Sequence, residues 1–414
     1  MNGMLRVFLL PVFLCVPLCS TVANSYADAP TFLVRKANGT EIRAPLASVD
    51  KDFCIAVGTK IIRKLDGTEW LSLRQSSVPL PALPSDEQII LTSGDRIPVR
   101  ELRLDDEKLR FRHADLNGNK DNVVPVGSVA MIWRSAPDGT VDVPRYRNRL
   151  LRGKRKRDVV LLRNGDTIEG TLNGLSAEQV EVEVARKNVA TKWSRVSAVL
   201  LSTDLTEKTR PKVAHARLVL SSTDRSPGGR ITVVSPDCDG ATFSAKTTFG
   251  SLIRVPIERV VSLESSGSNL VHLSDLTPAK FTFTPYLDEM FAWSADANVL
   301  GRDLLLGEST YDKGVGLHAD SRISYALDGK YRRFDALVGL DDNDGREGNV
   351  RIRVLLDGKP VELGKTEWKR GDKAVRISVE LSEAKEMTLV VEALGKGPIQ
   401  GVVDVVEARL IRKD

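Results

Sequence analysis

Apolar and polar residues alternate in short runs along most of the chain, and turn residues separate the runs. Val180, Val182 and Val184 alternate with glutamates in one run, and 375–381 shows the same period of two. This period places every second side chain on one face of a β-strand. No apolar stripe with the helical period extends beyond two turns. The pattern therefore predicts an all-β protein.

One order of elements recurs four times in the first two-thirds of the chain. Each copy has an apolar run, a turn with glycine, alternating strands and a closing apolar run. The turn glycine and the closing residue lie 32, 35, 31 and 32 residues apart in the four copies. Turns such as Asn164-Gly165-Asp166 have the composition of tight hairpins, in which glycine takes a positive φ. These spacings indicate an internal repeat.

Each repeat holds about five short strands and resembles the small barrels of the Sm-like type. A domain of this size buries little surface alone, so we expect the repeats to pack on one another. The expected order is a signal peptide at 1–29, repeat 1 at 30–80, repeat 2 at 87–134, a basic linker at 135–157, repeat 3 at 158–203, repeat 4 at 214–266 and a different domain at 268–414.

The linker between repeats 2 and 3 is strongly basic. Eight Lys and Arg residues fall within 145–157 without an acidic residue, and without them the net charge of +5 would be −3. Two interpretations stay open. The segment is a solvated linker with one helical turn at Arg147 to Leu151, or a tether for polyanions such as acidic polysaccharide or anionic lipid headgroups. Both predict an exposed segment.

Motifs that carry chemistry are missing. The sequence has no H-E-x-x-H, G-x-S-x-G, P-loop or dinucleotide-binding motif, and four His and four Cys leave little material for zinc sites. Lys and Arg (60) nearly balance Asp and Glu (55), which gives no argument for nucleic acid. Phe111 is flanked by Arg110 and Arg112, but alternation places its ring in the core. We expect no enzymatic activity and no nucleic-acid binding.

The first 29 residues have the features of a secretory signal peptide, with Arg6, an apolar stretch and the cleavage pattern Ala27-Asp28-Ala29. No later stretch approaches the about 18 apolar residues of a transmembrane helix. We expect an exported protein, periplasmic or extracellular, without a transmembrane segment. The mature chain keeps Cys54 and Cys238, which we expect to be free and buried.

From about Asn269 the alternating strands become longer. They include 350–354, 375–381 and 387–393, and turns such as Asp357-Gly358 join them. Strands of this number and spacing predict two sheets packed face to face in a sandwich.

The motifs of this last third resemble those of the NPCBM family, a carbohydrate-binding module found beside glycosyl hydrolases. K-G-V-G-L-H-A stands at 313–319, F-D-A-L-V-G-L-D-D at 334–342 and I-R-V-L-L-D-G-K at 352–359. The resemblance covers about 268–414 and implies a galactose-binding-like jelly-roll β-sandwich. Many members have an aspartate and a tryptophan before the final A-R-L, whereas this chain has no aromatic ring between Asp404 and Leu410.

A sugar site needs planar side chains for stacking and charged groups for vicinal hydroxyls. The candidates on the expected loops are His318, Tyr311, Asp341, Asp342 and Trp368. The sequence leaves alternatives open for them. His318 fits a core position that orients its strand, Trp368 fits packing under its loop, and the two aspartates fit a plain turn between strands.

No cofactor is expected, but a structural calcium ion is an open possibility. Jelly-roll modules often hold one, and the acids of 296–298 and Asp303 could join Asp404 as ligands.

Together these observations favour an exported, non-catalytic protein that binds glycan through its C-terminal module. The alternative is a cell-envelope scaffold whose sandwich binds another protein. An open groove with His318 and the two aspartates favours the first hypothesis, and a face sealed by the 268–310 segment favours the second.

Overall fold

Strands dominate the structure, a computed structural model that describes residues 29–206, 211, 213–224, 226–266, 269–285, 289–395 and 400–413. In these ranges α1 (Val143–Arg152) is the one α-helix, and it is neither long nor apolar enough to cross a bilayer. The predicted β architecture is confirmed. The expected signal peptide lies, up to residue 28, outside the described residues.

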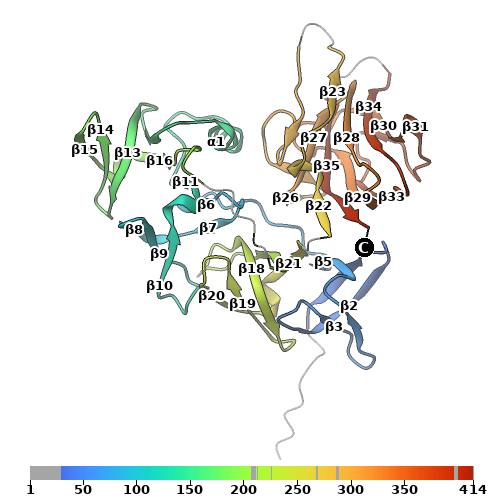
Figure 1. Cartoon of the computed structure of the whole chain (residues 1–414), viewed down its shortest axis with the longest axis horizontal. Helices are drawn as coiled ribbons and strands as arrows, with labels where there is room; N and C mark the ends of the chain where they lie inside the picture. Colours follow the sequence, from blue (N-terminus) through green and yellow to red (C-terminus); the bar gives the residue numbers. More distant parts are fainter. Residues whose placement is uncertain are drawn as a thin grey trace, which may run out of the picture.

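Four groups of strands, here named units 1 to 4, form the first two-thirds of the chain (Figure 1). Unit 1 contains β1 (Thr31–Lys36), β2 (Glu41–Val49), β3 (Ile55–Val57), β4 (Arg63–Leu65) and β5 (Trp70–Gln75). Unit 2 contains β6 (Gln88–Leu91), β7 (Arg96–Pro98), β8 (Arg100–Asp105), β9 (Lys108–Arg112), β10 (Asp121–Pro125) and β11 (Val129–Trp133). Unit 3 contains β12 (Asp158–Leu162), β13 (Thr167–Leu175), β14 (Gln179–Val184), β15 (Lys187–Lys192) and β16 (Val196–Leu200). Unit 4 contains β17 (Ala216–Leu220), β18 (Gly229–Cys238), β19 (Thr242–Thr247), β20 (Leu252–Pro256) and β21 (Val260–Ser265).

The units share one strand order, in which the first strand pairs with both the second and the last. β1 pairs with β2 and β5, β12 with β13 and β16, and β17 with β18 and β21. The turn glycines have the expected positive φ, 81° at Gly39 and 89° at Gly165. Unit 2 departs from five strands, because β8, β9 and β10 form a separate three-stranded sheet.

The last strands join the units in pairs. β5 of unit 1 lies antiparallel to β21 of unit 4, and β11 of unit 2 lies antiparallel to β16 of unit 3. β18 of unit 4 also pairs with β7 of unit 2, so strands of all four units belong to one 18-stranded sheet. The structure therefore does not show the separate small barrels that the repeat pattern predicted.

One hydrophobic core extends through all four units. It includes Phe32 of unit 1, Phe111 of unit 2 and Phe243 of unit 4, each fully buried. The core position predicted for Phe111 is confirmed. Both cysteines are free thiols. Cys238 is buried in this core, whereas Cys54 is only partly buried.

The last third forms two six-stranded antiparallel sheets and a two-stranded hairpin (Figure 1). The first sheet contains β22 (Leu270–His272), β24 (Ser294–Ala295), β27 (Gly314–His318), β29 (Tyr331–Leu340), β33 (Val375–Glu380) and β35 (Val402–Arg412). The second contains β23 (Lys280–Phe283), β28 (Ser321–Ala326), β30 (Asn349–Leu356), β31 (Lys359–Pro360), β32 (Glu367–Lys369) and β34 (Glu386–Ala393). The hairpin is β25 (Leu304–Leu306) with β26 (Ser309–Tyr311).

The core of this sandwich lies between the two sheets. Val350, Ile352 and Val354 of β30 are buried there, whereas Arg351 and Arg353 between them are only half-buried. The alternation in the sequence thus predicted the inward face of this strand.

The basic linker is not wholly exposed, which corrects both interpretations of it. Asp142 caps α1 by accepting a hydrogen bond from the Arg145 amide at 3.1 Å. Arg147 and Asn148 on the inner side of the helix are buried, and both donate to the Asp303 carboxylate, at 3.5 and 2.8 Å. An amphipathic helix has replaced the expected single turn, and its inner face docks against the sandwich domain.

Candidate functional site

Three strand ends meet at one edge of the sandwich. β27 ends at His318, which lies opposite Val402 at the start of β35, and β29 ends at Leu340, opposite Val403. Because β35 lies between β27 and β29, His318 and Asp341 are on its two sides. The structure thus places three predicted site residues, His318, Asp341 and Asp342, at one edge.

His318 belongs to an aromatic cluster. Its ring stacks on Phe291, with centroids 4.1 Å apart and planes 10° apart, and meets Phe283 edge-on at 6.0 Å. The imidazole is buried, and burial lowers its pKa, so the ring is uncharged at neutral pH. Phe283 and Phe291 are only partly buried and lie beside the exposed Met290. This cluster is a partly open aromatic surface at this edge.

The two aspartates are built into a turn. Asp341 is fully buried and accepts hydrogen bonds from the amides of Asn343 and Asp344 at 3.0 and 2.7 Å. The Asp342 carboxylate accepts from the Glu308 amide at 3.0 Å. The segment 298–308 therefore covers this turn, and the described residues form no open groove that contains both His318 and the aspartates.

A pair of buried carboxyl groups lies behind the turn. Asp404 is fully buried beside Asp341, and one oxygen of each group has no hydrogen-bond partner among the described residues. Burial, and then the neighbouring Asp341, raises the pKa of Asp404 well above its usual range. Burial also raises the pKa of Asp341. Such a pair favours a shared proton over two negative charges.

The residues proposed as calcium ligands do not converge. Asp296 accepts from the Lys313 ammonium group at 2.8 Å, and Asp303 binds Asn148 of α1. In the described part of the chain, no group of three or more His, Cys, Asp or Glu side chains could hold a metal ion. The expected calcium set does not fit the structure.

Tyr311 and Trp368 lie on strands, which corrects their expected position on loops. The burial of Trp368 agrees with the packing alternative that the sequence left open. Trp368 lies in β32, fully buried in the core between the sheets. Tyr311 lies in β26, where its hydroxyl accepts from Arg74 of unit 1 at 2.9 Å and burial raises its pKa. Trp368 therefore packs the core, and Tyr311 holds the sandwich against unit 1.

Little in the sequence indicated the two phenylalanines of the cluster. Phe283 is the last residue of the alternating run Phe281-Thr282-Phe283, which indicates only a strand with one apolar face. Phe291 follows a stretch without period, so its stacking on His318 depends on the fold.

Comparison with known proteins gives several matches. Ninety-five residues, 23% of the chain, are 37% identical to a Renibacterium salmoninarum protein named "Putative endo-alpha-N-acetylgalactosaminidase". The chain spans 6% of the length of that relative.

Two solved structures from Clostridium perfringens are also similar. CBM51 from GH95, in complex with methyl-galactose, has 25% identity and a TM-score of 0.31, over 34% of this chain and 99% of that one. CBM51-2 with the INT domains of ZmpB, in complex with GlcNAc, has 22% identity and a TM-score of 0.32. This match covers 56% of this chain and 45% of that one. The family model of the NPCBM/NEW2 domain matches residues 269–411, the range of the sandwich, and the resemblance of this part of the sequence to that family is confirmed.

Proposed function

We propose that this chain is an exported, non-catalytic protein that binds glycan through residues 269–411. The observation that carries the proposal is the match of this range to the NPCBM/NEW2 domain. Within this range we place the glycan site at the aromatic cluster of His318, Phe283 and Phe291. In this proposal units 1 to 4, which we regard as diverged Sm-like repeats, are a non-catalytic support for the module.

The cluster has the chemistry of a sugar-stacking surface. Phe283 and Phe291 are partly exposed, and an aromatic face packs well against the C–H groups of a pyranose ring. His318 is uncharged and holds Phe291 by stacking, so it acts as a support for the platform. Galactose and N-acetylglucosamine are the sugars to test first, because the CBM51 structures were solved with methyl-galactose and GlcNAc.

The alternative is a cell-envelope scaffold in which the same edge binds another protein. The observation that favours it is the sealed turn at Asp341 and Asp342, since the carboxylates expected to bind hydroxyls are occupied within the chain. A partly exposed aromatic cluster with Met290 also suits a protein contact.

A glycan array followed by calorimetry separates these functions. We expect the full-length mature chain to bind galactose- or GlcNAc-terminated oligosaccharides, and Phe291→Ala and Phe283→Ala to abolish binding while the fold is kept. Phe249→Ala in unit 4 is the matched control, because Phe249 is also a partly buried phenylalanine. The Phe249→Ala variant should bind glycan with the same affinity as the wild type.

Two results would contradict the proposal. Wild-type affinity in both folded cluster variants would place the site elsewhere on the module. A wild-type chain that binds no glycan on the array would favour the scaffold.

A further inference from the structure

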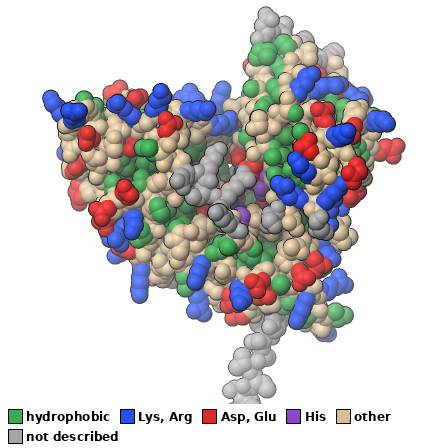
Figure 2. All heavy atoms as spheres, viewed as in Figure 1, with side chains coloured by type: hydrophobic (Ala, Val, Ile, Leu, Met, Phe, Trp, Pro, Cys, Tyr) green, Lys and Arg blue, Asp and Glu red, His purple; other side chains and the backbone are tan. Residues whose placement is uncertain are grey.

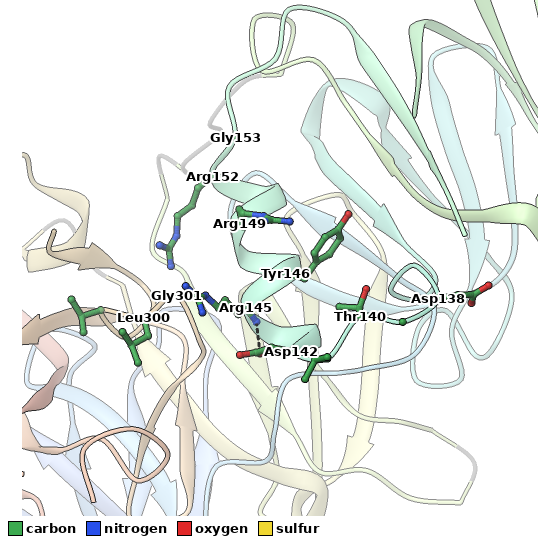
Figure 3. Close-up of a pocket in the computed structure, with 13 residues that line it drawn as sticks. Asp138, Thr140, Asp142, Arg145, Tyr146, Arg149, Arg152, Gly153, Leu300 and Gly301 are labelled. Carbon is green, nitrogen blue, oxygen red and sulfur yellow. Dashed lines mark hydrogen bonds between the residues drawn. The ribbon is translucent and has the colours of Figure 1, made fainter. Parts of the chain in front are cut away.

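A cleft of about 920 Å³ lies between α1 and the loop 299–301 of the sandwich domain. Residues 138–142 and the exposed face of α1 form one wall, and Val299, Leu300 and Gly301 form the other (Figure 3). Figure 2 shows a deep notch between the two lobes of the molecule. The volume is in the range of about 300–1,000 Å³ typical of small-molecule sites.

Three arginines of α1 line this cleft. Arg145, Arg149 and Arg152 have the spacing i, i+4, i+7, which places them on one face of the helix. Arg145 and Arg152 extend toward Leu300 and Gly301, while Arg149 lies over the Tyr146 ring, 4.8 Å from its centroid (Figure 3). Like charges at this spacing repel each other, whereas Arg149 and Arg152 in the last turn complement the helix dipole.

The carboxylates of the cleft do not neutralise these arginines. Asp142 binds Arg302 at 2.6 Å and caps the helix, and Asp138 binds Arg163 at 2.9 Å. Within the described residues no ion pair engages the three arginines, and Arg152 donates only to the Ser294 hydroxyl, at 3.3 Å. The cleft therefore carries an excess of positive charge available to a ligand.

Buried contacts fix the two walls relative to each other. Arg147 and Asn148 of α1 hold Asp303, and Asn148 also donates to the Gly301 carbonyl at 3.2 Å. The loop that forms the second wall is thus bound directly to the helix that carries the cations. A preorganised site loses less free energy on ordering its side chains around a ligand.

We propose that this cleft is a second ligand site, separate from the sandwich edge, and that it binds a short acidic saccharide. Guanidinium groups bind carboxylate or sulfate oxygens in pairs, while Val299 and Leu300 offer apolar surface to the sugar ring. Single-stranded nucleic acid prefers an extended groove with several stacking aromatics. Here one tyrosine, already covered by Arg149, lies in a cleft bounded at both sides.

Calorimetry on the full-length mature chain tests this site. The probes are a heparin-derived tetrasaccharide, which carries sulfate, a tetragalacturonate, which carries carboxylate only, and neutral cellotetraose. We expect at least one acidic probe to bind, with affinity that falls as salt is added, and cellotetraose not to bind. The stronger acidic probe identifies sulfate or carboxylate as the preferred group.

Charge-matched variants separate a site from general attraction. We expect Arg149→Gln to weaken binding by about tenfold, and the triple variant at Arg145, Arg149 and Arg152 to abolish it. The control triple variant, Lys154→Gln with Lys156→Gln and Arg157→Gln, removes the same charge outside the cleft and should keep near-wild-type affinity. Phe291→Ala should not affect this binding, so the two sites are tested independently.

Three results would overturn the proposal. The first is that neither acidic probe binds. The second is equal loss in the two triple variants, which indicates attraction by net charge. The third is binding of single-stranded DNA or phosphatidylserine vesicles as strong as that of the saccharides.

Discussion

Arg409 of β35 donates a hydrogen bond from Nη2 to Oε2 of Glu264 in β21 at 2.8 Å, and its side chain is 1% exposed. This buried ion pair joins the sandwich domain to unit 4. Burial raises the pKa of Glu264, and Arg409 opposes that rise. The contact between the domains therefore includes an ion pair, Arg409 with Glu264, that is desolvated in the folded protein.

Removal of Glu264 should destabilise the protein more than removal of Arg409. Without Glu264 the buried guanidinium stays charged, because arginine does not lose its proton in proteins. Without Arg409 the carboxyl group can bind a proton, since burial already raises its pKa. We expect Glu264→Leu to cost about 3–5 kcal/mol of the free energy of unfolding, and Arg409→Leu to cost less, by urea titration.

The control for this pair is Arg351→Leu. Arg351 binds Glu367 at 2.6 Å at the surface, with both side chains more than a third exposed, so its loss should leave the free energy of unfolding nearly unchanged. Equal losses for Glu264→Leu and Arg409→Leu would contradict the argument from protonation.

Asp404→Asn should raise the melting temperature near neutral pH. Burial and the Asp341 carboxylate raise the pKa of Asp404 in the folded protein, so folding takes up a proton. Stability then falls as the pH rises above about 4, the usual pKa of aspartate. Asparagine does not titrate, so the variant should melt above the wild type near pH 7 and together with it at about pH 3.

Thermal melts of both proteins across this pH range check the prediction. The reverse order near neutral pH, with Asp404→Asn melting lower, would mean that the pair requires its negative charge.

Trp368→Phe should leave both the fold and glycan binding nearly unchanged. The ring is fully buried, and its Nε1 has no hydrogen-bond partner among the described residues, so phenylalanine loses no such bond. Trp368→Ala should cost about 3–5 kcal/mol through the cavity it leaves. Unfolding and calorimetry measure the two properties. If the Trp368→Phe variant folds but does not bind glycan, Trp368 is part of the sugar site.

Gly316→Ala should destabilise the sandwich. A Cβ atom at this position would lie 2.5 Å from the Ala297 carbonyl oxygen and from the Asn298 carbonyl carbon, both backbone atoms. Relief of this overlap should cost about 1–3 kcal/mol, seen as a lower melting temperature. Gly364→Ala, with nothing within 4 Å of the added carbon, is the control. An unchanged melting temperature for Gly316→Ala would show that segment 297–298 can move away.

Local patterns predicted what depends on local geometry. The period of two identified β30 and the core position of Phe111, because alternation alone sets which side of a strand faces inward. The cap at Asp142 and the proline after it are signals for the start of α1, but the density of arginines favoured a linker instead.

The site depended on contacts that no local pattern contains. Asp341 is buried beside Asp404 of the distant strand β35. The Glu308 amide reaches Asp342, and Arg74 of unit 1 reaches Tyr311. His318 finds its partners 35 and 27 residues upstream, at Phe283 and Phe291. The sequence motifs contain three residues that the fold brings to one edge of the sandwich, but the fold decides which side chains of that edge meet solvent.

The pairing of last strands limits how this chain can be shortened. β11 and β16, the last strands of the two middle units, pair with each other. β5 and β21, the last strands of the first and fourth units, also pair with each other. An uncovered strand edge tends to pair with other molecules and aggregate. Deletion of a single unit leaves such an edge. Excision of units 2 and 3 together keeps the outer pair closed, but it removes β7, a partner of β18, and part of the core that all four units share. Shortened forms of the protein should therefore keep the four units together.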